Sequence, residues 1–134
     1  MLILHKKTDK KYIQTLPISQ FKGRIITIFT PGEVETAVNY LLTFPLLGLD
    51  TETRPSFGRG VRNKVSLLQV STADTCFLFR LNRIGFPPAL CRLLEDERVI
   101  KVGLSLKDDF LSMHQRGSFT PHNIVTLQHL VKEF

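Results

Sequence analysis

The chain has 134 residues, 43% of them hydrophobic and 22% charged, which is typical of a single soluble globular domain. No apolar run approaches the ~18 residues that cross a membrane, and the first residues lack the long apolar stretch of a signal peptide, so we expect neither a membrane nor a secreted protein. The formal net charge of +6 favours a polyanionic partner, and Cys76 and Cys91 fit no metal spacing, which favours free thiols in the reducing cytoplasm.

Basic residues dominate the start of the chain. Residues 1–24 hold six lysines or arginines against one acid, and we interpret them as a basic leader before the domain. A solvated leader without a binding role is an equally favoured alternative.

A strand and a helix are predicted next. Residues 25–29 are β-branched and aromatic, which favours a strand. Thr30, Pro31 and Glu33 then stand at the N-cap, N1 and N3 positions of a helix, so they predict a capping box. Apolar residues at helical spacing follow, namely Val34, Ala37, Val38, Leu41 and Leu42.

Residues 46–53 form a short apolar run that ends in two acids, Asp50 and Glu52. This pattern predicts a buried central strand, on which these two side chains point to the same face. Two carboxylates on one face repel each other, and a divalent cation between them would offset the repulsion. We therefore expect a metal site here.

A basic loop is predicted over residues 54–63, because Gly, Pro and Ser are frequent there. From residue 54 to residue 64 the chain has four basic residues and no acid. We expect the loop to contact phosphates and its aromatic residue to stack on a base, the residues being Arg54, Arg59, Arg62, Lys64 and Phe57. A mobile, solubilising segment is the alternative.

Residues 65–70 and 75–81 favour two strands joined by a turn at 72–74. A helix is predicted over 87–97 and a buried strand over 99–104. Ser105 and Asp108 then stand at capping-box spacing before another helix, with Gly117 as its C′ residue.

Two acids fall in the first turn of this helix. We expect Asp108 to complement the helix dipole, and Asp109 is the better candidate to face Asp50 and Glu52. Residues 124–125 favour a short last strand, and an apolar stripe at helical spacing ends the chain, at Leu127, Leu130, Val131 and Phe134. The predicted fold is an α/β domain whose mixed sheet is flanked by helices, with its site at the carboxyl ends of strands.

Three blocks, residues 47–53, 64–70 and 102–109, closely resemble the DEDD superfamily of 3′–5′ exonucleases, in the branch that includes ribonuclease D and the Werner-type exonuclease domain. The resemblance covers residue 25 to the end. It implies a ribonuclease H-like fold and two-metal hydrolysis of terminal phosphodiesters with Mg²⁺ or Mn²⁺, on a single-stranded or 3′-ended nucleic acid. Its first motif matches Asp50 and Glu52, and its second matches Asp109. Thr53 and Gln69 lie within the matching blocks; we expect Thr53 to contact the nucleic acid, and Gln69, on the strand beside the site, to be structural or to lie beside the substrate.

The third motif of the family combines a Tyr or His with the fourth acid, and no Asp or Tyr follows Asp109 in this sequence, where Glu133 is the only later acid. We therefore interpret residues 25–134 as an exonuclease domain that lacks its C-terminal helices. A sheet face left uncovered by those helices would favour self-association. The alternative to an exonuclease is a nucleic-acid-binding or interaction module without catalysis.

Overall fold

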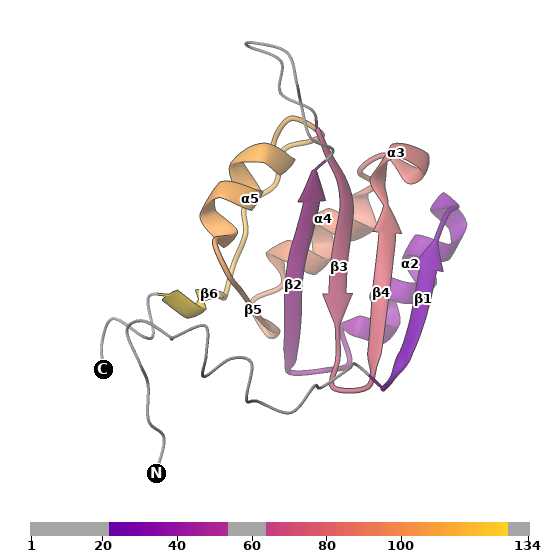
Figure 1. Cartoon of the computed structure of the whole chain (residues 1–134), viewed down its shortest axis with the longest axis horizontal. Coiled ribbons are helices and arrows are strands. Elements are labelled where there is room, and N and C mark those ends of the chain that lie inside the picture. Colours follow the sequence, from indigo (N-terminus) through magenta and orange to yellow (C-terminus); the bar gives the residue numbers. More distant parts are fainter. Residues whose placement is uncertain (1–21, 54–63, 129–134) are drawn as a thin grey trace, which may run out of the picture.

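A computed structural model describes residues 22–53 and 64–128 of the chain. A six-stranded mixed sheet with the strand order β1-β4-β3-β2-β5-β6 forms the centre of this part (Figure 1). The strands are β1 (Arg24–Ile28), β2 (Leu46–Thr53), β3 (Val65–Ser71), β4 (Thr75–Arg80), β5 (Ile100–Gly103) and β6 (Ile124–Thr126). The predicted ribonuclease H-like mixed sheet is therefore confirmed.

The sheet combines an antiparallel centre with parallel edges. β2, β3 and β4 pair antiparallel in succession, whereas β5 runs parallel to β2, β6 parallel to β5, and β1 parallel to β4. The antiparallel pair β3–β4 is closed by the predicted turn, in which the Thr75 N–H donates to the Thr72 hydroxyl at 3.0 Å. β2 thus lies between an antiparallel and a parallel neighbour, as the sequence predicted for a central strand.

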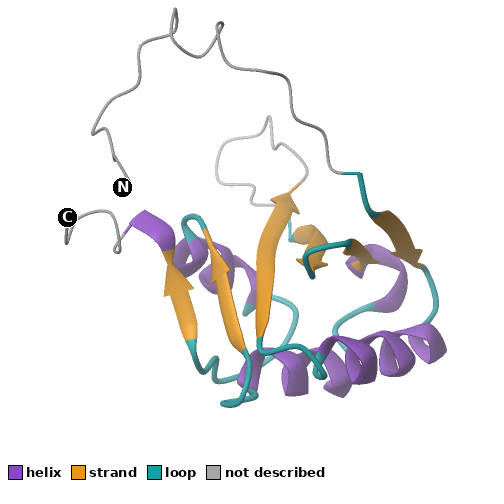
Figure 2. Cartoon of the chain, turned by 90° about the horizontal axis from the view of Figure 1, so that it is seen from below, coloured by secondary structure: helices purple, strands orange, loops and turns teal. Residues whose placement is uncertain are grey.

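The helices are α2 (Pro31–Leu41), α3 (Leu81–Ile84), α4 (Pro88–Glu95) and α5 (Leu106–Met113). None of these described helices has the length and apolar character to cross a membrane. α2 and α4 lie behind the sheet in Figure 1, and the view from below in Figure 2 shows helices gathered along one side of the strands. α5 lies beside the upper end of β2 in Figure 1, where it follows β5.

The core lies between the sheet and the helices behind it. Leu47 and Leu49 of β2, Val38 of α2 and Leu93 of α4 are buried there. Burial of one such side chain typically contributes about 1.5–3 kcal/mol. On the opposite side of β2, Leu46 is exposed, and on the face of the sheet that looks toward the viewer in Figure 1 no helix of the described residues lies over β1 and β4. Self-association through this face stays a prediction.

The start of α2 has the predicted capping residues. The Glu33 carboxylate accepts hydrogen bonds from both the Thr30 backbone N–H, at 3.2 Å, and the Thr30 hydroxyl, at 2.6 Å. Pro31 occupies the first helical position, where its missing N–H costs nothing. Val34, Ala37, Val38 and Leu41 are buried, as the apolar stripe predicted.

The capping box predicted at Ser105 and Asp108 is wrong. Ser105 has φ 52° and ψ 34°, which is the left-handed region, and its side chain makes no capping hydrogen bond to α5. Its N–H and hydroxyl are bonded to Gln128 instead, so they are not available to the helix start. The spacing of two polar residues could not reveal this more distant partner.

Gly117 is not the C′ residue of α5, which was also a wrong prediction. The helix ends at Met113, and Gly85 is the one glycine of the described residues with positive φ. A Cβ on Gly117 would lie 3.1 Å from the Phe86 ring, so the glycine permits close packing there. The short helix α3 was not predicted. The cysteines are half-buried and free, as expected.

Candidate active site

The two acids of β2 lie near its carboxyl end, next to β3. Leu47 and Leu49 alternate into the core, whereas Asp50 and Glu52 are exposed on the opposite face, in agreement with the two-residue period of a strand. The Asp50 carboxylate accepts a hydrogen bond from the Thr51 backbone N–H at 2.9 Å. These contacts leave both carboxylates accessible to solvent and to a ligand.

A β-bulge shapes the end of this strand. Glu52 pairs with Leu67 of β3, but the next residue, Thr53, pairs with Val65, so Ser66 is the extra residue. The Ser66 hydroxyl donates to the Glu52 carbonyl oxygen at 3.1 Å. Bulges bend a strand and increase its local twist, and they are frequent beside active sites. The bulge therefore sets the direction in which β2 leaves the sheet after its second acid.

Gln69 lies directly across from Asp50 in the antiparallel pair β2–β3. Directly opposed residues of such a pair present their side chains on the same face, about 4.5–5.5 Å apart at Cβ. The half-buried side chain of Gln69 thus lies on the same face of the sheet as Asp50.

Asp109 lies in the first turn of α5 and is half-buried. Burial raises the pKa of its carboxyl group, a hydrogen bond from the Thr51 side chain lowers it, and the negative charges of Asp50, Asp108 and Glu52 raise it further. The net direction is upward, so the ionised form of Asp109 is disfavoured in the fold. The structure thus brings Asp109 within electrostatic reach of both acids of β2, as the sequence predicted, while Asp108 is exposed.

These acids fit a hard divalent cation in their chemistry and location. All are carboxylates, the ligands that Mg²⁺ and Mn²⁺ prefer, and their mutual repulsion at Asp109 is what a cation would relieve. Their side chains do not converge, however, because no three His, Cys, Asp or Glu residues in ranges 22–53 and 64–128 form a group that could hold a metal. The carboxylates therefore lie near one another, but in the described residues they are not arranged as a set of three ligands around one cation.

The predicted nucleic-acid contacts are only partly covered by the structure. Thr53, at the end of β2, and Lys64, directly before β3, are exposed and flank the segment 54–63 along the chain. The remaining four predicted contacts lie outside the described residues, namely Arg54, Phe57, Arg59 and Arg62. Their roles stay predictions.

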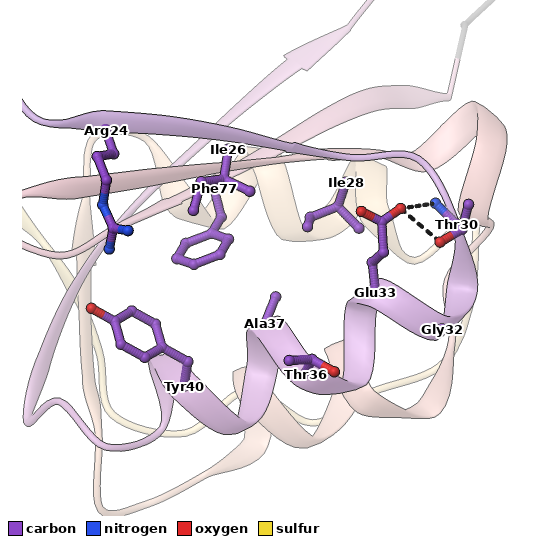
Figure 3. Close-up of a pocket in the computed structure, with 10 residues that line it drawn as sticks. All are labelled: Arg24, Ile26, Ile28, Thr30, Gly32, Glu33, Thr36, Ala37, Tyr40 and Phe77. Carbon is purple, nitrogen blue, oxygen red and sulfur yellow. Dashed lines mark hydrogen bonds between the residues drawn. The ribbon is translucent and has the colours of Figure 1, made fainter.

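A cavity of about 630 Å³ lies elsewhere, between β1 and α2 (Figure 3). Ile26, Ala37 and Phe77 give it apolar walls, and Arg24 lies at the end near Tyr40. Its one acid, Glu33, is hydrogen-bonded to the helix start. The strands that line this cavity are β1 and β4, and β3 lies between them and β2 in the sheet, so the cavity is not the acidic site.

Sequence reasoning missed three residues that support the site. The sequence around Thr51 and Ser66 predicts only that both belong to strands. Arg116 belongs to no recognisable motif. The Arg116 guanidinium donates to the carbonyl oxygens of Val65, at 2.6 Å, and Leu81, at 3.2 Å, and to the Asn82 side chain. It ties the end of α5 to the start of β3. No local signal predicts such a contact, because its partners lie 34 to 51 residues away.

Comparison with known proteins is consistent with this geometry. A family model described as 3′–5′ exonuclease matches residues 25–134. A 3′–5′ exonuclease of Arabidopsis thaliana is 30% identical over 117 residues, which cover 78% of this chain and 41% of that protein. The chain thus spans about two fifths of the length of this relative.

Two solved structures are similar in fold. The EXD2 exonuclease domain soaked in Mg and GMP superposes with a TM-score of 0.68 at 26% identity, over 83% of this chain and 60% of that one. A Trypanosoma brucei RNase D in complex with the RNA U12 has a TM-score of 0.67 at 20% identity, over 81% of this chain and 39% of that one. At this identity, the second comparison supports the fold alone.

Proposed function

This chain belongs to the 3′–5′ exonuclease family, and from that membership we propose that it acts on single-stranded or 3′-ended nucleic acid, hydrolysing terminal phosphodiesters with two divalent metal ions. The observation that carries the proposal is the electrostatic coupling of Asp109 to Asp50 and Glu52 at the end of β2. The negative charges of Asp50 and Glu52 raise the pKa of the Asp109 carboxyl group, and a bound cation would offset this repulsion.

In this proposal Asp50, Glu52 and Asp109 are the metal ligands and catalytic acids. Mg²⁺ or Mn²⁺, when bound, would polarise the phosphodiester and stabilise charge on the attacking and leaving oxygens. The Thr51 side chain lowers the pKa of the Asp109 carboxyl group and would thereby favour the ionised form that binds a cation. The EXD2 domain soaked in Mg supports the choice of cation.

The remaining residues would bind the substrate strand. Gln69, across from Asp50, is placed to donate its amide hydrogens to a phosphate or sugar oxygen. Thr53 and Lys64 stand on either side of the segment 54–63 and would contact the backbone phosphates. The fold shared with an RNase D described in complex with RNA makes RNA one substrate to test beside DNA.

A second function, binding of nucleic acid without cleavage, is favoured by one specific observation. After Asp109 the sequence has no Asp and no Tyr, so the form of the family's third motif that pairs a Tyr with an Asp is absent from these 134 residues. Such a module would bind a 3′ end and a metal but would turn over slowly or not at all.

The test uses a 5′-labelled single strand of DNA and one of RNA, incubated with the chain and Mg²⁺ or Mn²⁺. We expect a ladder that shortens from the 3′ end and is abolished by a chelator. Substitution of a residue that only supports a metal ligand typically lowers activity by about 10–100-fold. Asp50→Asn removes a proposed ligand itself, so it should slow hydrolysis by more than that. Equal degradation by the chain and by Asp50→Asn would refute the metal assignment. Binding without hydrolysis would favour the second function.

A further inference from the structure

Ser105 has a backbone conformation that a serine rarely adopts. It is one of two non-glycine residues with positive φ in the described part of the chain, and it stands directly before α5. A left-handed conformation is strained for a residue with a Cβ atom, and such strain persists only where the surroundings enforce it. Ser105 is also four residues before the candidate acid Asp109, whose N–H is bonded to the Ser105 carbonyl oxygen at 3.3 Å.

The side chain of Gln128 enforces this conformation. Its Oε1 accepts the Ser105 backbone N–H at 3.0 Å, and its Nε2 donates to the Ser105 hydroxyl oxygen at 2.9 Å. Gln128 follows β6, and β6 pairs with β5. One amide group therefore holds both polar groups of Ser105 and ties the end of β5 to the chain beyond β6.

The direction in which α5 leaves β5 follows from this contact. Leu106, the first residue of α5, is buried against Gly103, and the space for a Cβ on Gly103 is already taken by Leu106 and by the Leu49 carbonyl oxygen of β2. The helix start is thus packed directly beside the residue that precedes Asp50. A change of φ at Ser105 would rotate the whole first turn relative to β2, and Asp109 with it.

We propose that Gln128 is a positioning residue of the candidate active site, which holds Ser105 in its left-handed conformation and thereby sets Asp109 against Asp50 and Glu52. Its importance for hydrolysis rests on the proposed function, but its effect on the position of Asp109 does not. In the described residues the Gln128 side chain is hydrogen-bonded to Ser105 and to none of the three acids, so it acts through Ser105 and the first turn of α5.

The test compares the full chain with Gln128→Ala, Gln128→Glu and the double variant Ser105→Gly/Gln128→Ala. Glutamate can accept hydrogen bonds from both the Ser105 N–H and the Ser105 hydroxyl, so Gln128→Glu retains both contacts. Glycine adopts positive φ readily, so it allows the same helix direction without the amide. Gln115→Ala is the matched control, because Gln115 is an exposed glutamine just beyond α5 for which the described residues show no side-chain hydrogen bond.

The first measurement is the nuclear Overhauser effect between Thr51 and Asp109 side chains, which needs no enzymatic activity. We expect Gln128→Ala to lose this signal while it still unfolds cooperatively. Gln128→Glu, the double variant and Gln115→Ala should keep it. Retention of the signal in Gln128→Ala, or failure of the glycine to restore it, would overturn the proposal. Should Gln128→Ala not fold, recovery of both folding and the signal in the double variant would support it, and no recovery would overturn it.

The second measurement is metal-dependent hydrolysis by the same proteins. We expect Gln128→Ala to lower kcat by about 10–100-fold with little change in KM, since misplacing a catalytic group has an effect of this order. If the wild type is active and Gln128→Ala has the same kcat, the positioning role is contradicted and the proposed function stays intact. An inactive wild type that shows the expected Overhauser effects would refute the hydrolytic function and leave the positioning role intact.

Discussion

Replacing Gly103 by alanine is expected to disturb the contact on which the candidate site is built. Gly103 ends β5, and a Cβ atom there would lie 2.5 Å from the Leu49 carbonyl oxygen and 2.8 Å from Cδ2 of Leu106. Leu106 is a side chain and can move, but the Leu49 oxygen belongs to the backbone of β2, directly before Asp50. The substitution must therefore shift β2, the end of β5, or both.

The expected cost follows from that geometry. Forcing one carbon into a packed core typically costs 1–3 kcal/mol, and a backbone clash at 2.5 Å places Gly103→Ala in the upper part of that range, at about 2–3 kcal/mol. A typical unfolding entropy per residue then predicts that Tm falls by about 7–11 °C for a chain of this length. Hydrolysis should also slow, because Asp50 moves with Leu49.

The assay is urea denaturation followed by circular dichroism, with Gly32→Ala as the control. Gly32 is exposed near the start of α2, and a Cβ there meets nothing within 4 Å. Gly32→Ala should be neutral or stabilise the fold by up to about 1 kcal/mol, since alanine is the better helix former. A Gly103→Ala protein within about 0.5 kcal/mol of wild type would refute the close packing of α5 and β5 against β2.

Four further outcomes are expected. Asp109→Asn should raise the free energy of unfolding at pH 7 by about 1 kcal/mol, which is typical when a strained active-site group is removed. Because the fold raises the pKa of the Asp109 carboxyl group, this gain in stability should vanish when unfolding is measured below pH 3.8, the ordinary pKa of the group. Thr51→Val should raise the pKa of Asp109 further by removing a hydrogen bond, which a carboxyl NMR titration would show, and an unchanged titration would count against that contact. Arg116→Met should lower the free energy of unfolding, measured by urea denaturation, by about 1.5–3 kcal/mol, because the charged hydrogen bonds of the guanidinium are lost. Arg83 is exposed, so Arg83→Met should lower it little. Equal losses in the two variants would contradict the anchoring role of Arg116. Mg²⁺ at about 100 times its Kd should stabilise wild type by about 2.7 kcal/mol in thermal unfolding, and an equal gain in Asp50→Asn would place the cation elsewhere.

Much of the fold was predictable because its signals are local. The short apolar run that ends at Asp50 predicts a buried strand, and β2 buries Leu47 and Leu49. The apolar stripe of α2 and the polar residues at its start likewise predict both its buried face and its first residue. Periodicity and capping reflect interactions between residues three or four positions apart, so a sequence displays them directly.

The errors arose where distant residues decide the local conformation. Ser105 has the spacing of a capping residue, but Gln128, 23 positions further on, takes its hydrogen bonds and the serine becomes left-handed. Gly117 was expected at a helix end, and its absent side chain instead makes room for Phe86. In both cases a tertiary contact outweighs a local preference that is worth only about 1 kcal/mol.

The acids of the candidate site could be predicted from the sequence, but the residues that shape the backbone around them could not. Asp50, Glu52 and Asp109 belong to recognisable blocks, and the fold places them at one end of β2. The bulge at Ser66 has no such signal, because a bulge depends on how two strands align. Sequence therefore identified acids that the fold brings near one another, while their catalytic role stays a prediction, and only the structure showed the bulge beside them.

The most direct test of the central claim is an Mn²⁺ titration followed by broadening of backbone amide NMR signals. The account predicts that broadening centres on residues 50–53 and on the first turn of α5, and that Asp50→Asn and Glu52→Gln each weaken it strongly. Broadening centred on another part of the chain, or equal broadening in wild type and both variants, would contradict a metal site at the end of β2.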